Sequence, residues 1–349
     1  MNQNKSYMKK DLINLLDNIQ ENGENAPTSE RYMLIDGLNL FFRNFSVIRA
    51  VNPDGAHIGG LGGFFRSLGF LIKTIQPTQV YVVFDGIGSS NNRKNIIPEY
   101  KSNRNINRIT NWDIFDNIEE EDQSKVDQIT RIIQYLKTLP VRTVSIDKVE
   151  ADDIIAYLSQ TLPTKQDDRA FIVSSDKDYL QLVDENVVVY RPIEKEFYVS
   201  QTVKDKFKVT PHNFLLYKLL MGDNSDGIPG IKGLGLKKLY KLFPELTKKD
   251  MSFDDLLDLC ENKLKEHVIY ARVLHDIELL ENKYKVMDLS NPMMDDEDKM
   301  FIDKFVEKSP INYLPSQFIE MYDQDKLGGL IRNVDIWIKE VFENLLENQ

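Results

Sequence analysis

Several common catalytic and structural patterns are missing from this sequence. One cysteine, Cys260, and four histidines among 349 residues exclude a disulfide framework and a Cys/His zinc site. No P-loop, dinucleotide-binding or nucleophile-elbow motif is present. The polar N-terminus has no signal-peptide core, and the richest apolar stretch, 59–75, contains Arg66 and Lys73. We therefore expect a soluble, cytoplasmic protein with no membrane partner.

An overall excess of basic residues is also missing. There are 44 Lys and Arg residues against 55 Asp and Glu, which gives a net charge of −11. Two segments reverse this balance: residues 86–110 contain five bases and one acid, and residues 228–241 contain four lysines and no acid. Because net charge describes the whole surface and not its clefts, the acidic total does not exclude an anionic partner at these segments.

The order of apolar patterns predicts an α/β core followed by helices. Short apolar runs at 32–36, 80–85, 142–147, 171–176 and 187–190 are typical of buried parallel strands, and helical periodicity separates them. We expect a mainly parallel central sheet flanked by helices over residues 29–205, preceded by a helical extension and linker, 1–28. A glycine-rich stretch between two helical segments predicts a helix–hairpin–helix region within 206–290, and residues 291–349 form a C-terminal helical tail.

Carboxylates follow the predicted strands at the edge where parallel sheets bind ligands. Others open the helix after the third strand or precede the glycine-rich stretch. Nine acids belong to this set: Asp36, Asp85, Glu150, Asp152, Asp153, Asp176, Asp178, Asp223 and Asp226.

Two interpretations of these acids are open. A single Asp after a strand usually caps a helix or turn. As a set, however, they repel: two like charges ~4 Å apart cost about 4 kcal/mol at an effective dielectric of about 20. Cations must neutralise such a cluster, and oxygen ligands favour Mg²⁺ or Mn²⁺. Two such ions would activate a water and stabilise the leaving oxygen of a phosphoryl centre.

The two basic segments are candidates for phosphate binding. Residues 93–108 combine basic side chains with Tyr100, which predicts a phosphate clamp with a ring to stack on a base. A solvated charged loop is the alternative. The stretch GIPGIKGLGLKK lets backbone amides approach a duplex strand, with Lys237 and Lys238 at the next helix start. Its alternative is a plain helix–helix turn.

Together these motifs resemble the five-prime nuclease family, which comprises flap endonucleases, phage 5′-exonucleases and the 5′-nuclease domain of bacterial DNA polymerase I. The resemblance lies in MLIDGLNLFFR, VVFDG with RKNIIPEYKSNR, VEADDIIAYL, VSSDKDYLQLV and GDNSDGIPGIKGLG, which run in order from about residue 33 to 240. Gly227 stands where the family often has Asn, and residues 105–118 match nothing in the family pattern.

The resemblance implies a structure-specific 5′ nuclease that works with two metal ions. One ion is held mainly by Asp36, Asp85, Glu150 and Asp152, the other mainly by Asp176, Asp178, Asp223 and Asp226, with Asp153 in support. The residues implied at the reacting phosphate are Arg93, Lys101 and Arg104. Those implied to bind DNA are Arg43, Tyr100, Gly230, Lys232, Gly233, Gly235, Lys237 and Lys238. Residues 86–125 would form a helical arch, and K⁺ would bind the hairpin carbonyls.

The implied substrates are 5′ flaps, nicked or gapped duplexes and RNA–DNA hybrids. The implied setting is flap or RNA-primer removal in phage DNA replication, by a monomer in the host cytoplasm. The length leaves no room for a polymerase domain, so we expect a standalone enzyme. A single-stranded DNA-binding protein or replicative polymerase is the expected protein partner. Two other functions stay open: a catalytically silent junction-binding protein of the same fold and a metal phosphatase on a similar core.

Overall fold

The computed structural model describes residues 29–102 and 109–347. A six-stranded sheet forms the centre of the molecule, in the order β3-β2-β1-β4-β5-β6. Its strands are β1 (Arg31–Asp36), β2 (Gln79–Val83), β3 (Arg142–Val144), β4 (Arg169–Val173), β5 (Val187–Arg191) and β6 (Glu196–Tyr198). Strands β1 to β5 are parallel, and only the edge strand β6 runs antiparallel.

Both faces of the sheet are buried, which explains why its strands are almost continuously apolar. In β1, Met33 and Ile35 enter one core, whereas Tyr32 and Leu34 enter the other. The first core is covered by α2 (Gly37–Val47), α3 (Gly59–Ile75) and α5 (Ile118–Leu136), and the second by α6 (Ala151–Thr161), α7 (Ser200–Phe207) and α8 (Phe214–Met221). The predicted α/β fold is thereby confirmed.

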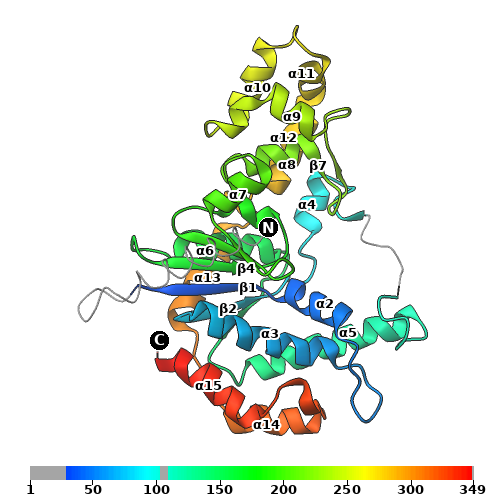
Figure 1. Ribbon diagram of the computed structural model, residues 1–349, viewed down its shortest axis with the longest axis vertical. Helices are drawn as coiled ribbons and strands as arrows, with labels where there is room; N and C mark the ends of the chain where they lie inside the picture. The colour runs from blue at the N-terminus through cyan, green and yellow to red at the C-terminus, as the bar shows by residue number, and fades with distance from the viewer. Residues whose placement is uncertain (1–28, 103–108, 348–349) are drawn as a thin grey trace, which may run out of the picture.

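A helical lobe extends from one side of the sheet (Figure 1). It contains α8, α9 (Leu236–Leu242), α10 (Phe253–Asn262), α11 (Val268–Val273) and α12 (Ile277–Met287). A short ladder of β7 (Gly222–Asp223) and β8 (Ile228–Pro229) lies between α8 and α9. Gly222 has φ +82°, and a Cβ on Gly230 would lie 2.3 Å from the backbone of Met221, so this turn depends on glycine.

The C-terminal helices return to the sheet. Helix α13 (Asp296–Lys308) packs on the α6 side through Ile302, and the Tyr157 hydroxyl donates to Asp303 Oδ1 at 3.0 Å. Helices α14 (Pro315–Gln324) and α15 (Val334–Glu347) pack beneath α3, at the end of the molecule opposite the helical lobe (Figure 1). Within the described ranges, no helix combines the length and apolar character required to cross a bilayer.

The connections between the parallel strands change direction at β1. From β1 the chain goes to β2 on one side and reaches β4 on the other, which places a topological switch point at the carboxyl ends of β1 and β4. The short helix α4 (Asn91–Ile96) lies between this edge and α12 in the helical lobe. Ligand binding in this class of sheet occurs at such an edge.

Candidate metal centre and nucleic-acid interface

Asp36 occupies the switch point because it ends β1 and caps α2. Its Oδ1 accepts a hydrogen bond from the Asn39 amide at 2.9 Å, and its Oδ2 accepts one from Ser174 Oγ at 3.2 Å. The side chain is buried. Burial and the nearby carboxylates of Asp152, Asp85 and Asp176 raise the pKa of Asp36 well above its ordinary value. A carboxylate in this position requires a cation when it ionises.

The other carboxylates around Asp36 come from three further elements. Asp85 follows β2 and accepts a hydrogen bond from the Ala151 amide at 2.7 Å, whereas Asp152 in α6 accepts one from the Tyr179 hydroxyl at 2.7 Å. Desolvation by the surrounding protein, with Asp152 and Glu150 nearby, raises the pKa of Asp85. Asp176 Oδ1 accepts from the Asp178 amide at 3.0 Å. We call this set, Asp36, Asp85, Glu150, Asp152 and Asp176, the sheet-edge group.

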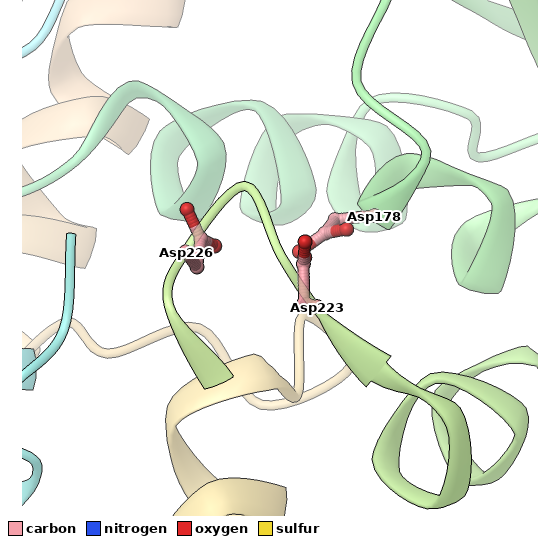
Figure 2. Close-up of side chains that lie close together, drawn as sticks. All are labelled: Asp178, Asp223 and Asp226. Atoms are coloured by element: carbon pink, nitrogen blue, oxygen red, sulfur yellow. The ribbon is translucent and has the colours of Figure 1, made fainter. Parts of the chain in front are cut away.

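A second, tighter set lies beside it. Asp178 begins a short 3₁₀ turn after β4, whereas Asp223 and Asp226 lie in the loop after α8 (Figure 2). Carboxylate oxygens of the three residues lie within 4.8 Å of one another, and all three side chains are buried. We call them the loop group. Their oxygen-only donor set fits Mg²⁺ or Mn²⁺.

Lys218 in α8 is the counter-ion of the loop group, and the sequence analysis missed it. Its ammonium forms ion pairs with Asp178 and Asp223, and its side chain is 9% exposed. Burial alone would raise the pKa of Asp223, but Lys218 and Ser225 bind the carboxylate and lower its pKa. The available signal was a single lysine within the apolar helix FLLYKLLM, five residues before Asp223.

Asp153, the ninth predicted acid, faces a protein cation. Arg93 in α4 binds it through two hydrogen bonds, Nη1 to Oδ2 at 2.6 Å and Nη2 to Oδ1 at 2.9 Å. Arg93 also forms an ion pair with Glu150 at 2.9 Å and donates from Nε to the Val286 carbonyl. Burial opposes the charge of Arg93, but Asp153 and Glu150 more than offset this and raise its pKa.

Tyr100 and Lys101 also bind the carboxylate of Glu150. The Tyr100 hydroxyl donates to Oε2 at 3.1 Å and Lys101 Nζ to Oε1 at 2.8 Å, while the Lys101 amide donates to the Asp226 carbonyl. The Tyr100 ring is only 3% exposed and packs among Ile97, Leu215 and apolar neighbours. In this arrangement the ring predicted to stack on a base faces the protein interior. Arg104 lies outside the described residues.

The hairpin residues predicted to bind DNA lie in the segment that follows α8 and in the first turn of α9. Lys232, Lys237 and Lys238 are exposed, and Lys238 Nζ donates to the Gly233 carbonyl at 2.9 Å. Gly230 precedes Lys232, Gly233 has φ +82°, and Gly235 immediately precedes α9. Two cations not predicted from the sequence also hold this hairpin: Arg272 Nη1 donates to the Lys232 carbonyl at 2.6 Å, and Lys283 Nζ to the Pro229 carbonyl at 2.9 Å.

Arg43 lies at the opposite side of the sheet edge, in α2. Its Nη2 donates to the Pro192 carbonyl at 3.2 Å, which joins α2 to the turn after β5. The structure therefore brings together eight of the nine predicted acids, pairs the ninth with Arg93 and places Lys101 beside them.

Comparison with known proteins agrees with this arrangement. A family model described as the N-terminal resolvase-like domain of 5′-3′ exonucleases matches residues 31–208. The chain belongs to the 5′-3′ exonuclease family. This confirms the 5′ nuclease family predicted from the motifs and, with it, the prediction of a nuclease.

Two relatives differ in how much of their length the chain matches. It is 30% identical to a 5′-3′ exonuclease of Aquifex aeolicus over 303 residues, which covers 86% of this chain and 94% of that protein. It is 27% identical to DNA polymerase I of Borreliella burgdorferi over 303 residues, which covers 84% of this chain but 31% of that protein. The chain thus spans about a third of the length of this polymerase relative.

Solved structures from bacteriophage T5 share the fold. The T5 D15 protein co-crystallised with metal ions gives a TM-score of 0.60 at 20% identity, covering 90% of this chain and 100% of that chain. A D15 flap endonuclease in complex with DNA and metal ions gives a TM-score of 0.59 at 20% identity, covering 91% and 100%. The fold shared with these structures thus extends over most of the chain.

Proposed function

We propose that this protein hydrolyses phosphodiester bonds at 5′ ends, flaps or single-strand/duplex junctions, with two divalent cations held by the sheet-edge and loop groups. The observation that carries this proposal is the meeting of the two carboxylate groups beside the glycine hairpin. Burial first, and then the charges of neighbouring carboxylates, raise the pKa values of Asp36 and Asp85, and bound cations would favour their ionised forms. Asp176 lies between the two groups. Its charge raises the pKa of Asp36, and its Oδ1 accepts a hydrogen bond from the Asp178 amide.

Mg²⁺ or Mn²⁺, when bound, would activate the attacking water and stabilise the leaving oxygen. The protein's own part is to position these ligands. Asp36 is oriented by Asn39 and Ser174, Asp85 by the Ala151 amide, and Asp152 by Tyr179. Fixed partners of this kind hold ligands in their productive orientation. Asp153 binds Arg93, which also binds Glu150, and in this way helps to position Glu150.

Among the three basic residues proposed to act at the scissile phosphate, Lys101 is the best placed. Its ammonium binds Glu150 at the edge of the acid cluster and its side chain is 15% exposed. An approaching phosphate would compete with Glu150 for this charge. Arg93 is 3% exposed, and we propose that it acts on the reaction by fixing Asp153 and Glu150. We retain Arg104 as a proposed phosphate ligand because of the motif resemblance.

For DNA binding, we propose that the hairpin grips one duplex strand through Lys232, Lys237 and Lys238 and the amides around Gly230, Gly233 and Gly235. Residues 86–125 are proposed to form an arch over the 5′ strand. Tyr100 would reach a base only if this segment moved. K⁺ at the hairpin would need carbonyls other than those of Pro229 and Lys232, which already accept hydrogen bonds from Lys283 and Arg272.

The biological setting is proposed from the motif resemblance. It is the removal of flaps or RNA primers during DNA replication, in a phage, with RNA–DNA hybrids among the substrates. A single-stranded DNA-binding protein or a replicative polymerase is the proposed partner of a monomeric enzyme.

The test is cleavage of a 5′-labelled flap duplex in Mg²⁺, in Mn²⁺ and in EDTA. We expect cutting near the junction in either metal and none in EDTA, and the product length separates endonuclease from exonuclease action. Tight binding without cutting in both metals would contradict the proposal and favour the silent junction-binding function. A blunt duplex of the same sequence serves as the control for structure specificity.

A further inference from the structure

A buried arginine lies beside the segment that leads from β4 to Asp176. Arg191 is the last residue of β5, and its side chain is 6% exposed. The register pairs Val173 of β4 with Tyr190 of β5, so Arg191 stands next to the point where β4 ends. Its Nη2 donates a hydrogen bond to the Ser175 carbonyl at 2.8 Å. A cation from the neighbouring strand therefore contacts the residue that directly precedes Asp176.

Both peptide groups of Ser175 are bound by side chains from other elements. Its amide donates to Oδ1 of Asn39 in α2 at 2.9 Å, and its carbonyl accepts from Arg191. The backbone amide of the same Asn39 binds Asp36 Oδ1. The Ser175 carbonyl and the Asp176 amide belong to one planar peptide group. The contact with Arg191 therefore fixes the direction in which the chain enters Asp176.

The guanidinium of Arg191 is itself held in place. Its Nη1 donates to Glu194 Oε1 at 2.6 Å, and its Cζ lies 5.4 Å from the ring centroid of Tyr198, which is buried. A planar guanidinium can donate to a carbonyl and a carboxylate at the same time, in a fixed geometry. Arg191 thus joins the turn between β5 and β6 to Ser175.

The ion pair with Glu194 does not by itself account for a buried arginine. Glu194 is 33% exposed, and ion pairs with partners open to water contribute little to stability. Among the described residues, Arg191 Nε and Ser175 Oγ are buried without a hydrogen-bond partner. Buried polar atoms without partners cost stability and are rare in folded proteins. A role at the Ser175 carbonyl accounts for this cost.

Charge alone would make Arg191 unfavourable to a metal centre. A buried cation repels divalent ions bound in its neighbourhood, and the repulsion is strongest where water is excluded. Any gain in metal affinity from Arg191 must therefore come from the geometry that it imposes on Ser175 and Asp176.

We propose that Arg191 is a positioning residue of the metal centre, which fixes the peptide group between Ser175 and Asp176 and so directs the Asp176 carboxylate toward a cation. This role rests on the proposed function, in which Asp176 lies between the two carboxylate groups. The hydrogen bonds of Arg191 go to Ser175, Glu194 and Tyr198, none of which belongs to either group. Arg191 therefore acts on the cations only through the loop that it holds.

The test measures Mn²⁺ affinity of the full chain by electron paramagnetic resonance of the free ion, without nucleic acid. We expect Arg191→Met to bind Mn²⁺ about tenfold more weakly than the parent, the usual cost of losing a partner that orients a ligand. Glu194→Gln is the matched control. It removes the ion pair but leaves the hydrogen bond to Ser175, so it should bind Mn²⁺ as the parent does. Excess Mn²⁺ should restore flap cleavage by Arg191→Met.

Arg191→Lys keeps the buried charge and decides the question if the methionine variant does not fold. Because lysine lacks the planar fork, we expect weaker Mn²⁺ binding in this variant as well. Circular dichroism verifies the fold of each variant.

Unchanged Mn²⁺ affinity in a folded variant would reduce Arg191 to a structural contact, and tighter binding would show that only its charge acts on the cations. Either result would overturn the proposal. An equal loss in Glu194→Gln would overturn it as well, because the effect would then belong to the ion pair. Failure of the nuclease proposal would appear separately, as a parent chain that binds no Mn²⁺ and does not cut the flap duplex.

Discussion

The two carboxylate groups differ in the cation that the protein itself supplies. In the loop group, Lys218 lies between Asp178 and Asp223, and the pKa of Asp223 is lowered. In the sheet-edge group, Asp36 has hydrogen-bond donors but no ammonium or guanidinium partner among the described residues, and its pKa is raised. The sheet-edge group also has protein cations, but Arg93 and Lys101 bind Glu150, whereas Asp36 keeps a raised pKa.

The largest expected effect comes from the residue that joins the two groups. Asp176→Asn should reduce cleavage about a thousandfold or more, because the transition-state stabilisation from bound cations amounts to several kcal/mol. Single-turnover cleavage of the flap duplex measures this. DNA binding in EDTA should be retained, and Asp303→Asn on α13 is the control. Cleavage at the parent rate would refute the assignment of Asp176 as a ligand.

Replacing Lys218 tests whether this lysine takes the place of a cation in the loop group, and the readout is the free energy of unfolding. Lys218→Met keeps much of the side-chain volume but leaves two buried carboxylates, Asp178 and Asp223, without their cation, and the free energy of unfolding should fall by about 3 kcal/mol in EDTA. Added Mg²⁺ should restore more stability to the variant than to the parent, since the ion binds the vacated group. Urea unfolding with and without Mg²⁺ measures both effects. Lys204→Met, an exposed substitution in α7, is the control.

Equal stabilisation of parent and variant by Mg²⁺ would show that Lys218 does not occupy a cation position. A stability loss in EDTA without this differential response would indicate a packing role only.

Replacing Lys101 tests whether the ammonium that binds Glu150 also contacts the reacting phosphate of the substrate. Lys101→Ala should slow single-turnover cleavage about a hundredfold, the typical cost of losing one electrostatic donor to the reacting group. The fold should persist because the side chain is partly exposed and Arg93 still binds Glu150. Circular dichroism verifies the fold. A rate equal to that of the parent would restrict Lys101 to a structural contact.

The pKa of Asp36 predicts a pH dependence of stability in the metal-free protein. Because its pKa is raised in the folded state, Asp36 favours folding at acid pH, and this contribution is lost as pH rises from about 3.8 toward its folded value. Asp36→Asn removes the effect, so the variant should gain stability relative to the parent as pH rises. Urea unfolding in EDTA at several pH values measures the difference. A difference that is constant with pH would contradict the raised pKa.

The smallest effect concerns the hairpin, which lies outside both groups. Lys237→Ala with Lys238→Ala should weaken duplex binding and flatten its salt dependence by about two in slope, as for two lost phosphate contacts. Metal binding at the carboxylates should not change. Duplex titrations at several salt concentrations measure the slope. An unchanged slope would reduce the hairpin to a helix–helix turn.

The sequence predicted the sheet and the edge at which the acids meet because both follow local rules, and the role of these acids as metal ligands remains a prediction. Short apolar runs define parallel strands, and carboxylates that follow such strands converge at one edge. The short antiparallel strand β6 was missed because its three residues carry no pattern of their own. The domain boundaries at 28, 205 and 290 remain predictions.

The roles of the basic segment could not be predicted in the same way. Arg93 and Tyr100 belong to one charged stretch with Lys101, but the packing of α4 against α12 turns the first two inward. This orientation depends on contacts with Val286 and Asp153, which are distant in the sequence. Lys218 was missed for a similar reason, since only the fold brings Asp178 to it.

The central claim is that the two carboxylate groups together hold two divalent cations. Calorimetric titration of the parent protein with Mn²⁺ tests this claim most directly, with Asp176→Asn and Lys218→Met titrated alongside. The account predicts about two ions per parent chain, weaker binding in Asp176→Asn and tighter binding of one ion in Lys218→Met. A parent chain that binds no ion, or binding that neither substitution changes, would contradict it.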